Sequence, residues 1–185
     1  LLGPLRDPRL LVLFGATFTL TMAFGAIEVG YPDFGRASGT DAWGPALIAI
    51  CSVGSAIGGL LYGGLHVRAA LVRQLPVAMA VMAIPLAAHL PVSNPWVLAP
   101  IAFLAGAMIA PAMTIVSLLV SEFAPPRHAT EAFTWSTTAI VTGLGAGMSI
   151  SGVLVEVHGP GGAFAWGAAS AFAAACFALA LRARR

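Results

Sequence analysis

The chain has 185 residues, of which 59% are hydrophobic and 9% are charged, and its mean hydropathy is +0.93. A soluble domain is about 25% charged, so this composition excludes a water-soluble domain and indicates a membrane protein. The formal net charge of +2 comes from nine arginines, with no lysine, against seven acidic residues. Because membrane orientation accounts for that excess, we expect membrane lipids and no nucleic acid as partners.

Six apolar runs are long enough to cross a bilayer, which takes about 20 mainly apolar residues for about 30 Å of hydrocarbon. None shows the alternating polarity of a β-barrel strand, and in lipid a helix satisfies its own backbone groups. The sequence therefore predicts an all-α membrane protein with one six-helix domain over residues 1–185. The predicted spans are Leu10–Pro32, Trp43–Gly64, Leu71–Leu90, Trp96–Glu122, Glu131–Val157 and Gly162–Leu181.

The arginines alternate with these spans, and only Arg36 breaks the pattern. Positive charge in short loops marks the cytoplasmic face, so we expect a multi-pass protein of the cell membrane with both termini cytoplasmic. The loops around Asp33 to Asp41, His89 to Asn94 and Glu156 to His158 are then outside. The arginines on the predicted cytoplasmic side are Arg6, Arg9, Arg68, Arg73, Arg127, Arg182, Arg184 and Arg185.

No pattern in the chain indicates an enzyme, a metal site or a cofactor. Cys51 and Cys176 lie inside apolar runs without metal-ligand spacing, where a buried free cysteine acts as a small hydrophobic residue. The four histidines are scattered over loops and helix ends. Gly-x-Ser-x-Gly, His-Glu-x-x-His and P-loop patterns do not occur.

The two halves of the chain resemble each other. Asp7-Pro8 before the first span matches Asn94-Pro95 before the fourth, and the second span aligns with the fifth. Three spans are an odd number of crossings, so residues 1–92 and 93–185 form two inverted three-helix repeats, an arrangement typical of secondary transporters. The aligned positions are Gly15 with Ala102, Met22 with Ile109, Ala26 with Met113, Gly54 with Gly147, Ile57 with Ile150, Gly59 with Gly152 and Leu61 with Leu154.

The whole chain resembles the C-terminal half of a major facilitator superfamily (MFS) transporter, the part with helices seven to twelve, and most of all the bacterial drug-efflux members. The resemblance rests on residues 5–9 (Leu-Arg-Asp-Pro-Arg), 25–32 (Gly-Ala-Ile-Glu-Val-Gly-Tyr-Pro), 54–63 (Gly-Ser-Ala-Ile-Gly-Gly-Leu-Leu-Tyr-Gly) and 125–127 (Pro-Pro-Arg). In the superfamily's loop motif, Gly59 and Leu61 match and Arg68 takes the last basic position. Glycines 63 and 64 replace its aspartate and first arginine, so no charge-relay gate is assigned to this loop.

The resemblance implies half of a secondary active transporter, an antiporter that moves small lipophilic or cationic molecules by alternating access as proton-coupled efflux. It implies no enzyme activity. One half lacks a complete cavity, so the expected partners are the substrate and an N-terminal half, in the same or a separate chain, or a second copy in a homodimer. The alternative function is a non-transporting scaffold, assembly or sensory subunit that uses the same bundle.

Glu28 is the one acidic residue that lies away from the ends of the predicted spans, and a charge there is a functional hypothesis by default. It lies 19 positions after Arg9, which at about 1.5 Å per residue puts it in the outer third of the membrane. It therefore has either a substrate or proton role, or snorkels to the outer interface. Thr17, Thr21, Phe24 and Gly25 share its helical face, which in the family lines the central cavity. Alternatively, the threonines bond their own backbone.

Two further sets of residues follow from the same comparison. The repeat register places Leu104, Met108, Pro111, Ala112 and Ile115 on the cavity side of the fourth span, as an apolar wall for lipophilic compounds or as plain core. The second and fifth spans carry closely spaced glycines, which allow helices to approach closely. These either slide against the opposite half, as the family implies, or pack statically within the bundle. They are Gly54, Gly58, Gly59, Gly63, Gly143, Gly147 and Gly152.

Overall fold

The structure is a computed structural model that describes residues 3–65 and 67–183. Helix makes up 88% of it, and the described residues contain no strand. Short 3-10 turns, η1 (Pro4–Arg6) and η2 (Pro126–His128), precede two of the helices. The helices are α1 (Pro8–Ala37), α2 (Trp43–Gly64), α3 (Leu71–Ala88), α4 (Pro95–Ala107), α5 (Ile109–Phe123), α6 (Ala129–His158) and α7 (Pro160–Ala183).

Six helical segments in the described part of the chain are long and apolar enough to cross a membrane. The predictions of an all-α chain and of six spans are confirmed. The second span has the predicted limits, Trp43–Gly64, and the others differ by a few residues at their ends. The fourth span, Pro95–Phe123, consists of α4 and α5 together.

The first and fourth spans begin in the same way. The Asp7 side chain accepts a hydrogen bond from the Arg9 backbone N–H at 2.8 Å, and Asn94 accepts one from Trp96 at 2.9 Å. In both helices proline follows the capping residue. Proline suits the first helical position because its missing N–H has no intrahelical partner there. The two dipeptides that match in the sequence therefore build the same helix start.

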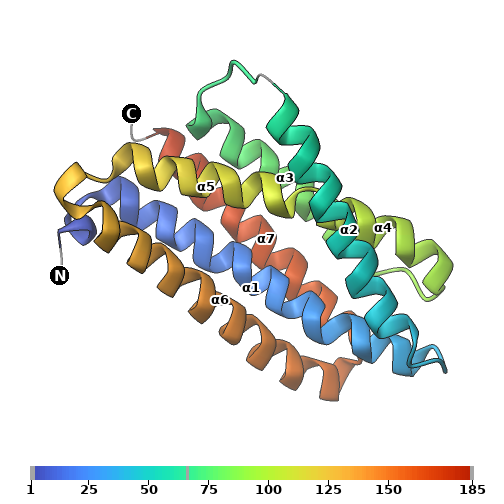
Figure 1. The fold of residues 1–185 in the computed structure, drawn as a ribbon. Coiled ribbons are helices and arrows are strands. Elements are labelled where there is room, and N and C mark those ends of the chain that lie inside the picture. Colours follow the sequence, from blue (N-terminus) through green and yellow to red (C-terminus); the bar gives the residue numbers. More distant parts are fainter. Residues whose placement is uncertain (1–2, 66, 184–185) are drawn as a thin grey trace.

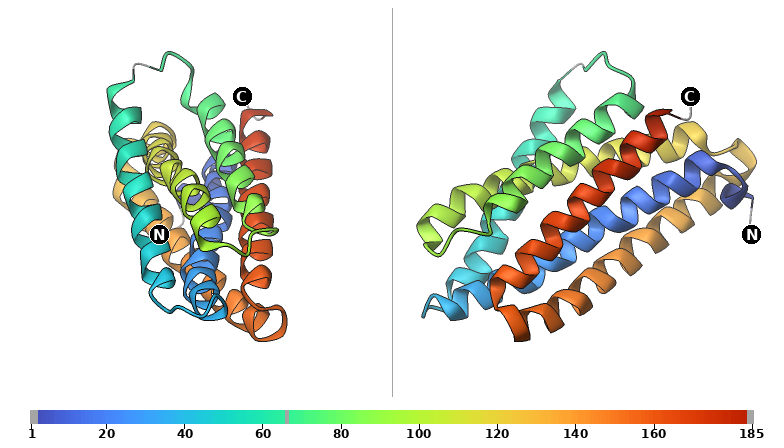
Figure 2. Two further views of the ribbon diagram at one scale, coloured as in Figure 1. Left: turned by 90° about the vertical axis from the view of Figure 1, so that its right-hand side faces the viewer. Right: turned by 180° about the vertical axis from the view of Figure 1, so that it is seen from behind.

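Helix α1 is the centre of the bundle (Figure 1). It packs against α6 and α7, while α2 packs against α4 and α3 against α7. In the best membrane-spanning window of α1 67% of residues are buried, against 22% for α2 and for α6. The rear view shows α3 beside α7, in agreement with their contact (Figure 2). The start of α1 and the end of α7 lie at the same end of the bundle.

The fourth span is interrupted at Met108, three residues before Pro111. Pro111 has no N–H to donate to the Ala107 carbonyl, and its ring crowds that carbonyl. The Met108 N–H instead bonds to the Gly106 carbonyl, and α5 restarts when Ala112 donates to Met108 at 3.0 Å. Helical positions before and after Met108 therefore do not follow one continuous register.

The closest helix crossings are built on glycine. A Cβ added at Gly54 or Gly58 would come closer than 3.0 Å to the main chain of Phe103 or Ala107 in α4. In α6, Gly143 and Gly147 lie equally close to the main chain of α1. These four glycines therefore lie at contacts between helices of this bundle. Gly59 faces the Ala110 side chain, whereas Gly63 and Gly152 face open space.

Candidate functional site

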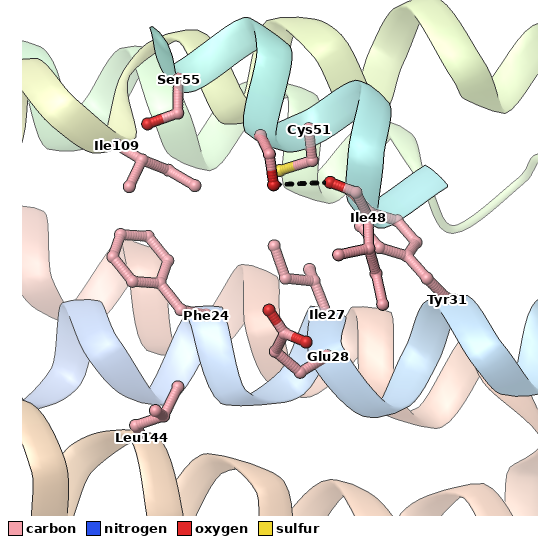
Figure 3. A pocket seen from close by; sticks show the side chains of 10 residues that line it. Phe24, Ile27, Glu28, Tyr31, Ile48, Cys51, Ser55, Ile109 and Leu144 are labelled. Atoms are coloured by element: carbon pink, nitrogen blue, oxygen red, sulfur yellow. Dashed lines mark hydrogen bonds between the residues drawn. The ribbon is translucent and has the colours of Figure 1, made fainter. Parts of the chain in front are cut away.

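A cavity of about 320 Å³ lies between α1, α2, α5 and α6, and we call it the α1–α2 pocket (Figure 3). Helix α1 contributes positions i, i+3, i+4 and i+7, which form one face of a helix. Helix α2 presents its most polar stretch to the same space. The lining residues are Phe24, Ile27, Glu28, Tyr31, Ile48, Cys51, Ser52, Ser55, Ile109 and Leu144.

Glu28 is the only charged residue in this lining, and its carboxylate points from α1 into the space below α2 (Figure 3). The side chain is exposed. Within the described residues it makes no hydrogen bond and no ion pair, whereas Asp7 pairs with Arg9 and Asp33 with Arg36. An unpaired carboxylate inside a membrane span is costly. A cation or a proton in the pocket would remove that cost.

The polar groups of α2 are oriented by their own helix. The Ser52 hydroxyl donates to the Ile48 carbonyl at 2.9 Å, so that its remaining capacity toward the pocket is as an acceptor. Cys51 is buried at 5% exposure. The pocket therefore combines one negative charge, acceptor oxygens and apolar walls, a composition that suits an organic cation.

One end of the pocket is closed by Tyr31, which is fully buried. Its hydroxyl lies 3.0 Å from His89 Nε2, and His89 Nδ1 lies 2.6 Å from the Pro85 carbonyl oxygen. The Phe164 ring packs on both, with centroids 5.9 Å from Tyr31 and 5.0 Å from His89. His89 follows directly after α3, and its burial lowers the pKa of the imidazole.

From the sequence His89 was expected in an exterior loop and Tyr31 at the headgroup end of a helix, whereas Tyr31 is fully buried. The spacing of three residues from Glu28 was a signal for Tyr31, because it puts both on one helical face. No signal existed for His89. Its partner lies 58 positions away in the chain, and only the packing of α3 against the rest of the bundle brings the two together.

The predicted stripe on α1 divides between two surroundings. Phe24 and Glu28 line the pocket, but Thr17, Thr21 and Gly25 lie at contacts inside the bundle. The hydroxyls of Thr17 and Thr21 donate to carbonyls one turn earlier, at 2.9 and 3.0 Å, which was the alternative interpretation of these threonines. Thr21 also reaches the Ala139 carbonyl of α6 at 3.4 Å.

The wall predicted on the fourth span lies elsewhere. Met108, Pro111 and Ile115 line a separate cavity of about 300 Å³ against α2 and α3, and Ala112 is fully buried. The residue of α5 in the α1–α2 pocket is Ile109. The repeat register misses this because it assumes an uninterrupted helix. Leu104, before the interruption, is 58% exposed.

The faces of α2 and α6 are the least covered. On α2 the exposed apolar residues include Val53, Ile57, Leu60 and Leu61. Arg68, in the loop after α2, is exposed and has no ion pair within residues 3–65 and 67–183. On α6 a row of threonines is exposed, and each hydroxyl except that of the first donates to its own helix. They are Thr130, Thr134, Thr137, Thr138 and Thr142.

Comparison of the chain with protein-family models, with curated proteins and with solved structures gives no match. Arguments about function therefore rest on the site itself.

Proposed function

We propose that this chain is a six-helix half of a secondary active transporter of the major facilitator type. In this proposal it exports small lipophilic or cationic molecules in exchange for protons, and it is not an enzyme. The observation that carries the proposal is the unpaired Glu28 carboxylate in a pocket between spanning helices. Ionisable groups in such places mark substrate and ion pathways.

Two inverted repeats are part of the proposal, and two features support them. The first and fourth spans begin with the same capped proline turn. In addition, α2 glycines contact the main chain of α4, and α6 glycines contact that of α1. Exchange of the first span with the fourth and of the second with the fifth converts one contact into the other, as an internal two-fold relation requires.

The second half of the transporter is proposed to cover α2 and α6. These helices have the lowest burial of the six spans, and the α1–α2 pocket lies between them and α1. The threonine hydroxyls of α6 that bond their own backbone need no further partner. The covering half is an N-terminal half, in the same or a separate chain, or a second copy. We place both termini in the cytoplasm, from the arginine distribution.

The chemical step assigned to Glu28 is an exchange of ligands. Its carboxylate holds either a proton or the cationic substrate, since each neutralises the same charge. Phe24 and Tyr31 supply aromatic faces beside it, and such faces attract organic cations. The pocket is thus proposed to bind a lipophilic cation on one side of the membrane and to release it when a proton takes its place.

Transport in proteoliposomes, with the second half present, tests this. A pH gradient should drive tetraphenylphosphonium transport in the wild type. Glu28→Gln should reduce it by at least about tenfold, because the amide cannot exchange a proton, while transport of a neutral lipophilic compound persists. Glu28→Asp should retain part of the activity. Glu156→Gln is the matched control, since Glu156 is an exposed acid near the end of α6 and outside the pocket.

Unchanged cation transport by Glu28→Gln would contradict the role of Glu28. It would leave the alternative that this carboxylate snorkels to the interface. Absence of transport of either compound by a folded wild-type complex would contradict the transporter proposal and favour a scaffold or sensory subunit.

A further inference from the structure

The two hydrogen bonds of His89 determine which of its nitrogens carries the proton. The Pro85 carbonyl oxygen can only accept, so Nδ1, 2.6 Å away, is the N–H donor. In the neutral ring Nε2 is then an acceptor, and the Tyr31 hydroxyl, 3.0 Å away, donates to it. Neutral His89 therefore holds the Tyr31 proton on the side away from the α1–α2 pocket.

The direction of the Tyr31–His89 hydrogen bond determines whether the Tyr31 hydroxyl is a donor or an acceptor toward a ligand in the pocket. With its proton committed to His89, the Tyr31 oxygen presents lone pairs toward the pocket, which Cys51 also lines. The Ser52 hydroxyl likewise donates its hydrogen bond to the Ile48 carbonyl. Together with the Glu28 carboxylate these groups make the pocket a set of acceptors, which favours a cation.

We propose that His89 is a second proton-binding group of the transporter, and that it controls cation binding in the α1–α2 pocket through the direction of the Tyr31 hydrogen bond. The inference deepens the proposed function and rests on it. When a proton binds Nε2, that nitrogen becomes a donor to the Tyr31 oxygen. The Tyr31 O–H must then rotate toward Cys51 and the pocket. The Tyr31 hydroxyl, which was an acceptor toward the pocket, becomes a donor, and the His89 ring behind it carries a positive charge. The pocket therefore loses affinity for a cation.

At the end of the α1–α2 pocket that Tyr31 closes, the charge that changes with pH is the proton on Nε2 of His89. The groups that face His89 are Tyr31 from α1, the Phe164 ring from α7 and the Pro85 carbonyl of its own helix. The titratable groups beyond Tyr31 are Cys51 and Glu28. Among the described residues no ion pair joins His89 to a charged side chain. Unperturbed tyrosine and cysteine lose their protons only above about pH 8.

The position of His89 indicates the side from which the proton arrives. It lies at the end of the bundle away from the start of α1, and the next residues, Leu90 and Pro91, are exposed. In the proposed orientation this is the outer side. Acid outside would therefore protonate His89 and release the cation outward, which is the direction that proton-coupled efflux requires.

Nuclear magnetic resonance of the purified protein with ¹⁵N,¹³C-labelled histidine tests the switch without any ligand. We assign the His89 signal by its loss in His89→Gln. At pH 8 it should show the Nδ1–H tautomer. In Tyr31→Phe the ring should titrate at higher pH than in the wild type, because the donor that favours neutral Nε2 is gone. His158→Gln, at an exposed histidine of α6, should change neither result.

Binding of tetraphenylphosphonium tests the coupling. Its affinity should fall on the order of tenfold as His89 becomes protonated, a size typical of coupled sites. By reciprocity the cation should lower the apparent pKa of His89 by the same factor. Glu28→Gln should weaken binding and keep the part of the pH dependence that follows the titration of His89, whereas His89→Gln should remove that part and leave only the competition of protons with the cation at Glu28.

Three results would overturn the inference. They are an Nε2–H tautomer in the wild type, a His89 signal that tetraphenylphosphonium leaves unchanged although the cation binds, and an unaltered pH dependence of binding in His89→Gln. The first two are measured on the wild type, with His89→Gln used only to assign the signal, so a failure of Tyr31→Phe to fold does not prevent the decision. No cation binding at any pH, with the expected tautomer, would instead overturn the proposed function and the coupling built on it.

Discussion

Replacement of Gly147 by alanine tests the closest contact in the bundle. A Cβ at this position would lie 2.8 Å from the carbonyl carbon and from the Cα of Met22, and still closer to the Met22 oxygen. Ordinary carbon contacts begin at 3.4 Å, so α6 must move away from α1 by at least the difference of 0.6 Å. The neighbouring atoms belong to a helix backbone and cannot rotate aside.

The expected cost follows from this geometry. Overpacking of a close-packed interior costs about 1–3 kcal/mol, and we expect the upper half of that range because Gly25 and Gly143 lie at the same interface. Gly145→Ala is the matched control in the same helix. Nothing lies within 4 Å of its added Cβ, and alanine favours a helix over glycine by at most about 1 kcal/mol. Its stability should be unchanged or slightly raised.

Unfolding of the purified protein in mixed micelles, followed by tryptophan fluorescence, measures both free energies. Gly147→Ala should unfold at lower denaturant than the wild type, and Gly145→Ala should not. The added substitution Met22→Ala should fail to rescue Gly147→Ala, because the contact is with the Met22 main chain. Equal stability of the two alanine variants, or rescue by Met22→Ala, would refute the close approach of α1 and α6.

Three further predictions concern other parts of the chain. Burial lowers the pKa of His89, so the unfolded state binds more protons below about pH 6.5. Stability should therefore fall as pH drops through that value, by up to about 1.4 kcal/mol per pH unit, and His89→Phe should remove this contribution in unfolding titrations across pH. Pro111→Ala restores a donor for the Ala107 carbonyl, so amide exchange of residues 108–112 should slow severalfold, and unchanged exchange would contradict the proline explanation. Impermeant thiol labelling from outside should modify Ser38→Cys and Asn94→Cys and spare Arg68→Cys and Arg127→Cys. Labelling of all four would remove the six-span topology.

Much of the fold was predictable because the bilayer requires each spanning segment to be apolar over the thickness of its hydrocarbon core. A span has to be apolar over a sufficient length, and the run from Trp43 to Gly64 shows both of its limits in the sequence. The starts at Pro8 and Pro95 were visible as well, because a capping residue followed by proline is a local signal. Pro111 is visible in the sequence and indicates an interruption of the fourth span, but it does not show that the break falls at Met108, since proline in a membrane helix either bends it or is accommodated.

The candidate site was predictable only in part. Glu28 and Phe24 were named from their position on α1, and both line the pocket. Helical periodicity also grouped Thr17 and Thr21 with them, but a helix in the centre of a bundle has neighbours on most of its faces. Hydropathy does not distinguish a face that meets α6 from a face that meets a cavity. Thr21 turned out to contact α6, and the hydroxyls of both threonines are bonded within α1.

The sequence by itself determined the class of protein, the six spans and the presence of one acidic residue away from the ends of the predicted spans, because these depend on composition and local order. Only the tertiary structure decided that Glu28 faces a pocket, that four glycines are buried between helices and that His89 meets Tyr31. Those relations join residues far apart in the chain. They depend on how each helix is rotated about its axis and how closely neighbouring helices pack. Hydropathy along the sequence does not determine either of these.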